Sequence, residues 1–172
     1  NWKAMNFEDS EWDAGPSGFG YGDNDDMTKL SDMRFYEETA DEPEQPGYLS
    51  LFIRRSFQVR NPSEIKELIF RVDYDDGFIA YLNGEEIGRS STMNFTGSPP
   101  PFDVEANAGH EVTAKPAMIN LKDHFQLLKP SPAQNILAIQ VHNTTKNSSD
   151  LSIRPRLVEM YILVGSLVNG LP

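Results

Sequence analysis

The chain has 172 residues, of which 38% are hydrophobic and 10% aromatic, and it contains no cysteine. This length suits one globular domain whose core requires neither a disulfide nor a metal. The absence of cysteine excludes a disulfide framework, a thiolate zinc site and a cysteine nucleophile. The formal net charge of −11 argues against nucleic-acid binding, because phosphates would be repelled. No apolar run in the sequence approaches the roughly 18 residues of a membrane span.

The negative charge is concentrated in the first 46 residues, which contain 13 of the 26 acidic residues and three bases. Within them, Asp23, Asp25 and Asp26 lie close together in a glycine-rich stretch. Carboxylate oxygens at this density suit Ca²⁺, so these three aspartates are a candidate site for a structural calcium ion. The alternative is a solvated acidic loop, because the spacing does not follow the EF-hand pattern.

From about residue 48 the hydrophobic residues recur with a period of two, which is typical of strands buried on one face. The strands predicted in this way are Leu49–Val59, Leu68–Tyr74, Phe78–Leu82, Glu85–Gly88, Met118–Leu121, Asn135–His142 and one or two strands within Leu151–Val164. Pro155 restricts the last of these segments to a sheet edge or a bulge.

Two turn signals lie within residues 66–89. The tripeptide Asp75-Asp76-Gly77 consists of residues that favour turns. Asn83-Gly84 is the strongest short signal for a hairpin, because a type I′ turn requires two positive φ angles. We therefore predict that residues 66–89 form a three-stranded antiparallel meander.

The other segments lack strand periodicity. Residues 90–116 contain consecutive prolines and several glycines, which predicts long loops with one short strand at most. Asp123–Lys129 fits one helical turn before a proline. Many short strands, long loops and scarcely any helix predict an all-β fold, a β-sandwich, that forms a single domain over residues 1–172.

Arg55 stands out within its predicted strand, because it falls on the same face as Ile53 and Phe57. A charge on a buried face is costly unless it is paired. We therefore expect a carboxylate partner for Arg55, with the acids of residues 73–76 as the first candidates.

Aromatic side chains in loops are candidates for sugar binding, because the face of a pyranose ring stacks on them. Trp12 and Tyr21 flank the glycine-rich stretch of the N-terminal third. A place in the core is the competing interpretation, because tryptophan is highly buried on average.

Polar candidates for the same ligand site lie at the ends of predicted strands. Asp75 and Asp76 occupy a turn, where their carboxylates also have a structural use as caps. His142 ends a strand, and Asn143 and Asp150 bound the polar loop that follows it. For His142 the competing interpretation is a neutral histidine that is hydrogen-bonded to a neighbouring loop.

No catalytic motif is present in the sequence. It has no Gly-x-Ser-x-Gly elbow and no glycine-rich loop that opens a predicted helix, so it lacks the local signatures of a serine hydrolase or a phosphate-binding enzyme. Adjacent acids in a turn do not form the pair across a cleft that glycoside hydrolysis requires. We therefore expect a domain that is not an enzyme.

Six segments in this order resemble the galactose-binding-like domains attached to large secreted bacterial proteins. The segments are Phe7–Trp12, Gly18–Asp23, Phe52–Phe57, Asp75–Gly84, Asn135–His142 and Ser148–Leu151. The segment Asp75–Gly84 is also similar to part of the sugar-binding jelly roll of β-galactosidase-like enzymes. The resemblance covers roughly residues 2–160 and implies a galactose-binding-domain-like jelly roll.

The resemblance also implies a function and a setting. It predicts a secreted or cell-surface accessory module, excised from a larger chain and monomeric when isolated. Such a module binds carbohydrate and thereby targets or anchors an attached enzyme. The alternative is a structural or protein-interaction spacer that packs against a neighbouring domain of the same chain. No cofactor is expected to be required in either case, and calcium is a candidate structural ion because relatives in the wider fold often bind one.

Overall fold

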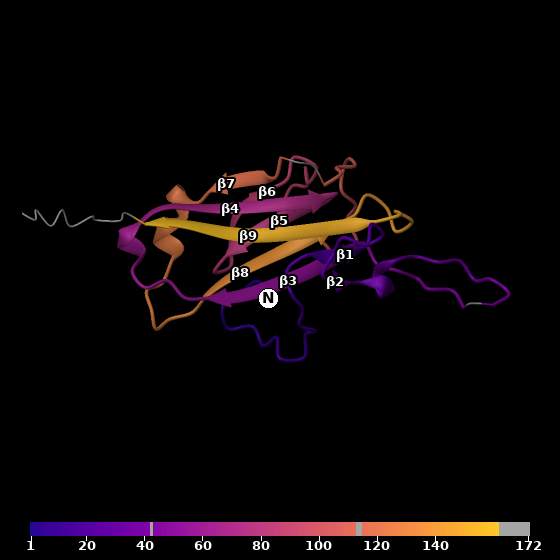
Figure 1. The fold of residues 1–172 in the computed structure, drawn as a ribbon, viewed down its shortest axis with the longest axis horizontal. Helices are drawn as coiled ribbons and strands as arrows, with labels where there is room; N and C mark the ends of the chain where they lie inside the picture. Colours follow the sequence, from indigo (N-terminus) through magenta and orange to yellow (C-terminus); the bar gives the residue numbers. More distant parts are fainter. Residues whose placement is uncertain (42, 113–114, 162–172) are drawn as a thin grey trace, which may run out of the picture.

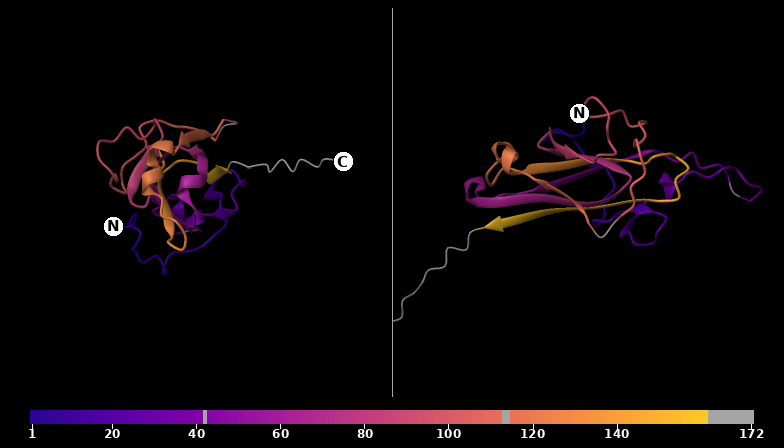
Figure 2. Two further views of the ribbon diagram at one scale, coloured as in Figure 1. Left: turned by 90° about the vertical axis from the view of Figure 1, so that its left-hand side faces the viewer. Right: turned by 90° about the horizontal axis from the view of Figure 1, so that it is seen from above.

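The computed structural model of the protein describes residues 1–41, 43–112 and 115–161. Two sheets stack face to face with their strands along the long axis of the molecule (Figures 1 and 2). One sheet has the order β2-β1-β9-β4-β7 and comprises β1 (Phe19–Tyr21), β2 (Thr28–Lys29), β4 (Ile65–Asp75), β7 (Ala117–Asn120) and β9 (Leu151–Tyr161). The other has the order β3-β8-β5-β6 and comprises β3 (Ser50–Phe57), β5 (Gly77–Leu82), β6 (Glu85–Arg89) and β8 (Asn135–His142). The predicted β-sandwich is confirmed.

Helical structure in the described residues is limited to three short 3₁₀ helices. They are η1 (Ser31–Met33), η2 (Pro62–Glu64) and η3 (Lys122–Leu127). The last coincides with the helical turn predicted before Pro130. None of the described helices is long and apolar enough to cross a lipid bilayer.

The main core lies between the two sheets and follows from the alternation seen in the sequence. Strand β4 contributes Leu68, Phe70 and Val72, which are all buried, and β8 contributes Ile139 and Val141 from the opposite sheet. Burial of each such side chain stabilises the fold by roughly 1.5–3 kcal/mol. An apolar core between the two sheets therefore stabilises the sandwich.

A second apolar cluster covers the outer face of the four-stranded sheet. Ile79 and Tyr81 of β5 pack there against Met93 and Ala106 of the loop after β6, and Trp2 of the N-terminal segment lies against them. The two central strands β5 and β8 are consequently buried on both faces. This explains why β5 is a continuous apolar run rather than an alternating one.

The predicted meander over residues 66–89 is half right. Strands β5 and β6 form the predicted hairpin, and Asn83 and Gly84 at its turn have φ angles of 52° and 95°. Strand β4, however, pairs with β7 and β9 in the other sheet. The chain crosses between the sheets at Asp75-Asp76-Gly77, because β4 and β5 each bury their apolar side chains in the same core from opposite sides.

The prediction for Arg55 is wrong, and its neighbour Arg54 has the expected environment. Arg55 is exposed, because β3 is the edge strand of its sheet. The Arg54 side chain is only 3% exposed and forms an ion pair with Asp9 at 2.7 Å. Arg54 also donates hydrogen bonds to the carbonyl oxygens of Trp2 and Ala4, so it fixes the N-terminal segment on the outer face of the sheet.

Strand β9 accommodates Pro155 in the way that the sequence predicts. Strand β1 pairs with β9 only over Leu151–Ile153, so that side of β9 is a free edge at Pro155. No neighbouring strand requires a hydrogen bond from the proline nitrogen there. On its other side β9 pairs with β4 along almost its whole length.

Candidate functional site at the loop end of the sandwich

Three loops and strand β1 meet at one end of the sandwich, on the right in Figure 1. The loops follow β4, β6 and β8, and they contribute residues 75–77, 109–111 and 143–150. Hydrogen bonds join these segments across long separations in the sequence, up to 127 residues for Tyr21 and Ser148. This end therefore gathers polar residues from most of the chain.

Asp76 holds two of the loops together. Asp76 is only 5% exposed. One carboxylate oxygen accepts a hydrogen bond of 2.9 Å from the backbone N–H of His110. The other accepts two bonds of 2.8 Å, from the backbone N–H and the hydroxyl of Thr144. Bonds from donors to a buried carboxylate compensate the cost of burying its charge.

Asn143 and Tyr21 connect the third loop to strand β1. The Asn143 amide donates to the Tyr21 hydroxyl and to the Asp150 carbonyl oxygen, both at 3.0 Å. The Tyr21 hydroxyl in turn donates to the carbonyl oxygen of Ser148 at 3.2 Å. Burial and the nearby Asp150 carboxylate raise the pKa of Tyr21 to about 12, so the phenol stays protonated at physiological pH.

Three carboxylates converge beside this network. Asp75, Glu111 and Asp150 place one oxygen each so that all three lie within 4.8 Å of one another. Asp75 is buried, Asp150 is half-buried and Glu111 is exposed. Burial, followed by the negative charges of Asp76, Asp150 and Glu111, raises the pKa of Asp75 to about 8. The spacing of these three oxygens is compatible with a shared metal ion.

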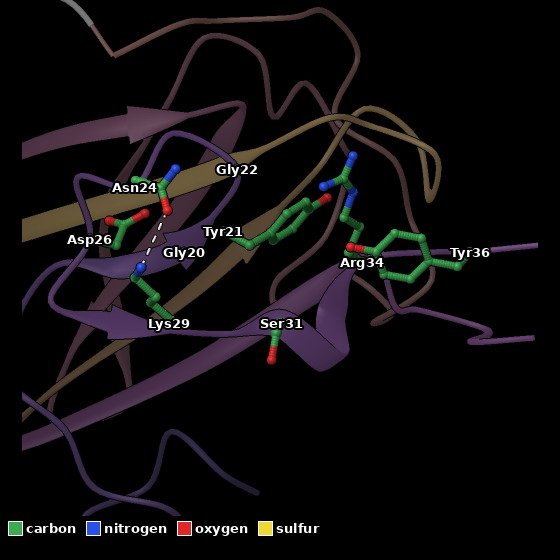
Figure 3. A pocket seen from close by; sticks show the side chains of 9 residues that line it. All are labelled: Gly20, Tyr21, Gly22, Asn24, Asp26, Lys29, Ser31, Arg34 and Tyr36. Carbon is green, nitrogen blue, oxygen red and sulfur yellow. Dashed lines mark hydrogen bonds between the residues drawn. The ribbon is translucent and has the colours of Figure 1, made fainter. Parts of the chain in front are cut away.

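An open hollow of about 280 Å³ also borders Tyr21. It is lined by Gly20, Tyr21, Gly22, Asn24, Asp26, Lys29, Ser31, Arg34 and Tyr36. Figure 3 shows Tyr21 in the middle, with Arg34 and Tyr36 on one side and Asn24, Asp26 and Lys29 on the other. Its volume is close to the lower end of the roughly 300–1,000 Å³ of small-molecule sites.

The hollow combines an aromatic wall with charged and polar groups. The Arg34 guanidinium lies 5.1 Å from the centre of the Tyr36 ring, which fits a cation–π contact. Tyr36 itself is 41% exposed. The Lys29 ammonium donates to the Asn24 amide oxygen at 3.2 Å. Asp26 is buried and has one carboxylate oxygen with no partner in the described part of the chain.

The predicted calcium ligands Asp23, Asp25 and Asp26 have different environments in the structure. Asp25 forms an ion pair with Arg154, and Asp26 accepts a hydrogen bond of 2.9 Å from the Ser152 hydroxyl. Asp23 is exposed. Burial, with the charges of Asp25 and Asp23, raises the pKa of Asp26. Asp26 therefore takes part in the hollow, whereas a calcium site made of these three residues stays a prediction.

The predicted ligand residues are only partly brought together. Tyr21, Asp75, Asp76, Asn143 and Asp150 all lie at the loop end, as described above. Trp12 packs on Phe7 in the N-terminal segment, with ring centres 5.6 Å apart. His142 is 0% exposed under the loop after β6, where its Nδ1 donates to the Val104 carbonyl oxygen at 2.6 Å. A direct contact of Trp12 or His142 with a ligand stays a prediction.

Sequence reasoning did not single out Glu111, Lys29, Arg34 or Tyr36. Glu111 lies in an aperiodic loop, and no local pattern marks it. For Lys29 and Arg34 a signal was present, because they are two of the three bases among the 13 acids of the first 46 residues. Isolated basic residues in such an acidic segment indicate a specific structural or binding role at their positions.

Comparison of the sequence finds no matching family model and no matching curated protein. Similar solved structures include a calcium-binding mutant of Bacteroides uniformis beta-glucuronidase 2, at 15% identity over 90% of this chain and 16% of that chain, with a TM-score of 0.48. A beta-glucuronidase from glycoside hydrolase family 2 shares 17% identity over 82% of this chain and 12% of that chain, with a TM-score of 0.46. Ruminococcus gnavus beta-glucuronidase shares 14% identity over 64% and 15%, with a TM-score of 0.38.

The chain thus spans less than a fifth of each of these proteins. At such identities and TM-scores the likeness gives no argument about activity, ligand or cofactor. The functional proposal therefore rests on the site described above.

Proposed function

We propose that this domain is a non-catalytic carbohydrate-binding module, and that the hollow between Tyr21 and Tyr36 is its binding site. The module would target or anchor an enzyme in the same secreted chain. The observation that carries the proposal is the hollow itself, because it places an exposed aromatic ring beside planar hydrogen-bonding side chains in a concave site.

Each part of the hollow matches a part of a sugar ring. The Tyr36 ring offers an apolar face for the C–H groups of a pyranose. Arg34 and the Asn24 amide donate hydrogen bonds to hydroxyl groups, and the Ser31 hydroxyl accepts them. The net charge of −11 favours a neutral glycan over an anionic one.

The size of the hollow indicates how the ligand is bound. About 280 Å³ suits one or two sugar units, with the rest of a polysaccharide outside. A second hollow of about 390 Å³ lies on the other side of Tyr36, between that ring and Pro43, Glu44 and Pro46. Tyr36 is therefore a shared wall, and we expect its loss to weaken binding more than the loss of any other single side chain.

Native gel electrophoresis through plant and algal polysaccharides tests the proposal. We expect at least one neutral polysaccharide to retard the protein, and Tyr36→Ala to weaken that binding about tenfold, which corresponds to roughly 1.4 kcal/mol. Phe102→Ala is the control, since Phe102 is an exposed aromatic ring that does not line either hollow. Unaltered mobility in every polysaccharide, or equal losses in both variants, would contradict the proposal.

The spacer alternative is supported by a different surface. On the outer face of the five-stranded sheet, Met118 of β7 and Val158 of β9 are exposed apolar side chains. A neighbouring domain that covered them would bury this surface. Faster proteolysis of the parent chain when Met118→Asp and Val158→Asp are combined, with unchanged polysaccharide binding, would favour the spacer.

A further inference from the structure

We propose that Asp75, Glu111 and Asp150 form a calcium site that ties together the loops after β4, β6 and β8. The site is distinct from the sequence-predicted acids Asp23–Asp26. It does not depend on carbohydrate binding, because none of the three acids lines the hollow.

The geometry of the three oxygens fits a shared ion. Calcium binds oxygen at 2.3–2.6 Å, so two ligands on opposite sides of the ion are at most about 5 Å apart. The three carboxylate oxygens lie within 4.8 Å of one another. Three carboxylates supply three to six ligand oxygens, and the exposed Glu111 leaves room for water to complete the six to eight that calcium takes.

Asp75 provides the second observation that points to a ligand. Asp75 is 3% exposed. Its carboxyl has a hydrogen-bond contact with another carboxyl group, that of Asp76, and accepts no hydrogen bond from an N–H or hydroxyl group of the described residues. Its neighbours are the carboxylates of Asp76, Glu111 and Asp150. A buried carboxylate among others requires a cation or a proton. The adjacent Asp76, by contrast, has three donors.

The surrounding contacts hold the ligands in place before any ion arrives. The bonds from His110 and Thr144 to Asp76 fix the loops that carry Glu111 and Asp150. The His110 ring also stacks on Tyr74, with centres 4.0 Å apart, and its Nδ1 donates to the Tyr74 carbonyl oxygen. The end of β4 thus positions both Asp75 and the segment that presents Glu111.

Thermal unfolding in 10 mM CaCl₂ and in EDTA, with NaCl matched for ionic strength, tests the site. If calcium is present at about a hundred times its Kd, we expect the Tm of the wild-type protein to rise by roughly 5–10 °C. Asp75→Asn should abolish the rise, while its Tm in EDTA stays close to that of the wild type, because asparagine keeps the volume of the side chain and adds no buried charge. The double variant Asp23→Asn, Asp25→Asn is the matched control and should keep the rise.

Calorimetric titration of calcium provides a second measurement that does not depend on the folding of Asp75→Asn. Glu111→Gln changes an exposed side chain, and we expect it to weaken calcium binding at least tenfold. An unchanged wild-type Tm, a rise that persists in Asp75→Asn, a rise that disappears in the Asp23/Asp25 double variant, or an unchanged affinity in Glu111→Gln would each overturn the proposal. Loss of polysaccharide binding alone would leave this site intact, so the two proposals fail separately.

Discussion

Asp75 and Asp76 are neighbours in the chain and both are buried, yet their carboxylates meet opposite environments. Asp76 accepts three hydrogen bonds from two loops, whereas Asp75 faces other carboxylates. A carboxylate with donors stabilises the fold, and one among like charges destabilises it until a proton or cation arrives. The two residues therefore have different uses, a structural one for Asp76 and a binding one for Asp75.

We predict that Asp76→Ala lowers the free energy of unfolding by about 3 kcal/mol, because it leaves buried N–H groups of two loops without an acceptor. Urea unfolding followed by fluorescence measures this. Asp73→Ala is the matched control, since Asp73 accepts no hydrogen bond within the described ranges, and it should cost less than about 1 kcal/mol. Equal costs would contradict the role of Asp76 as the anchor of the loops.

His142 gives the fold a dependence on pH. Burial lowers its pKa below the ordinary value of 6.5. Its Nδ1 donates to Val104, and its Nε2 has no partner among the described residues, so a second proton would have no acceptor. As the pH falls below 6.5, His142 therefore becomes protonated in the unfolded chain but stays neutral in the folded protein. The free energy of unfolding consequently decreases as the pH falls.

We expect the unfolding free energy of the wild-type protein to fall more steeply between pH 7 and pH 5 than that of His142→Gln, which keeps a donor but does not titrate in this range. Urea unfolding at several pH values, compared between the two proteins, measures the difference in slope. Parallel slopes would show that His142 titrates normally in the fold.

Among the elements, the N-terminal segment depends most on a single side chain. Arg54 connects β3 to the carbonyl oxygens of Trp2 and Ala4 and to the Asp9 carboxylate. This holds Trp2 against Phe52 and Tyr81, with ring centres 4.8 and 5.6 Å away. The second apolar cluster is therefore closed by a segment that has no regular secondary structure of its own.

We predict that Arg54→Met destabilises the protein by about 2–3 kcal/mol and exposes Trp2, because buried carbonyl oxygens lose their donors. Arg55→Met, one residue later and exposed to solvent, should change stability by less than about 0.5 kcal/mol. Urea unfolding and the emission maximum of tryptophan follow both effects. The same loss in both variants would mean that the charge of β3, rather than the contacts of Arg54, stabilises the segment.

The elements also show how far the sequence alone determines the fold. The turn at Asn83-Gly84 is local, since two positive φ angles select its residues, and it is predicted correctly. The course of the chain after Asp75-Asp76-Gly77 depends on which sheet β5 joins, and turn residues carry no such information. Similarly, strand periodicity gives Arg54 and Arg55 opposite faces but does not say which face another segment covers.

The candidate site is predictable to the same extent. Residues at strand ends next to turns, such as Asp75, Asp76 and Asn143, were recognisable from their positions. Glu111 and Tyr36 come from aperiodic loops, and only the fold brings them to the loop end. The combination of residues into a hollow and a carboxylate cluster is therefore a property of the tertiary structure.

At the scale of the whole molecule, the two proposed sites share one end of the sandwich and have no residue in common. Both sheets support this end through loops that are joined by buried hydrogen bonds, while the opposite end carries the 3₁₀ helices η2 and η3 (Figure 1). A rigid scaffold that presents loops at one end is a common arrangement for binding. The central claim is therefore that this end binds carbohydrate in the hollow.

Titration of the ¹⁵N-labelled protein with the polysaccharide fragment that retards it most tests this claim most directly. The account predicts that the largest amide shifts map to Gly20, Gly22, Lys29, Arg34 and Tyr36, and that they disappear in Tyr36→Ala. Amide shifts centred instead on the outer face of the five-stranded sheet, around Met118 and Val158, would contradict it.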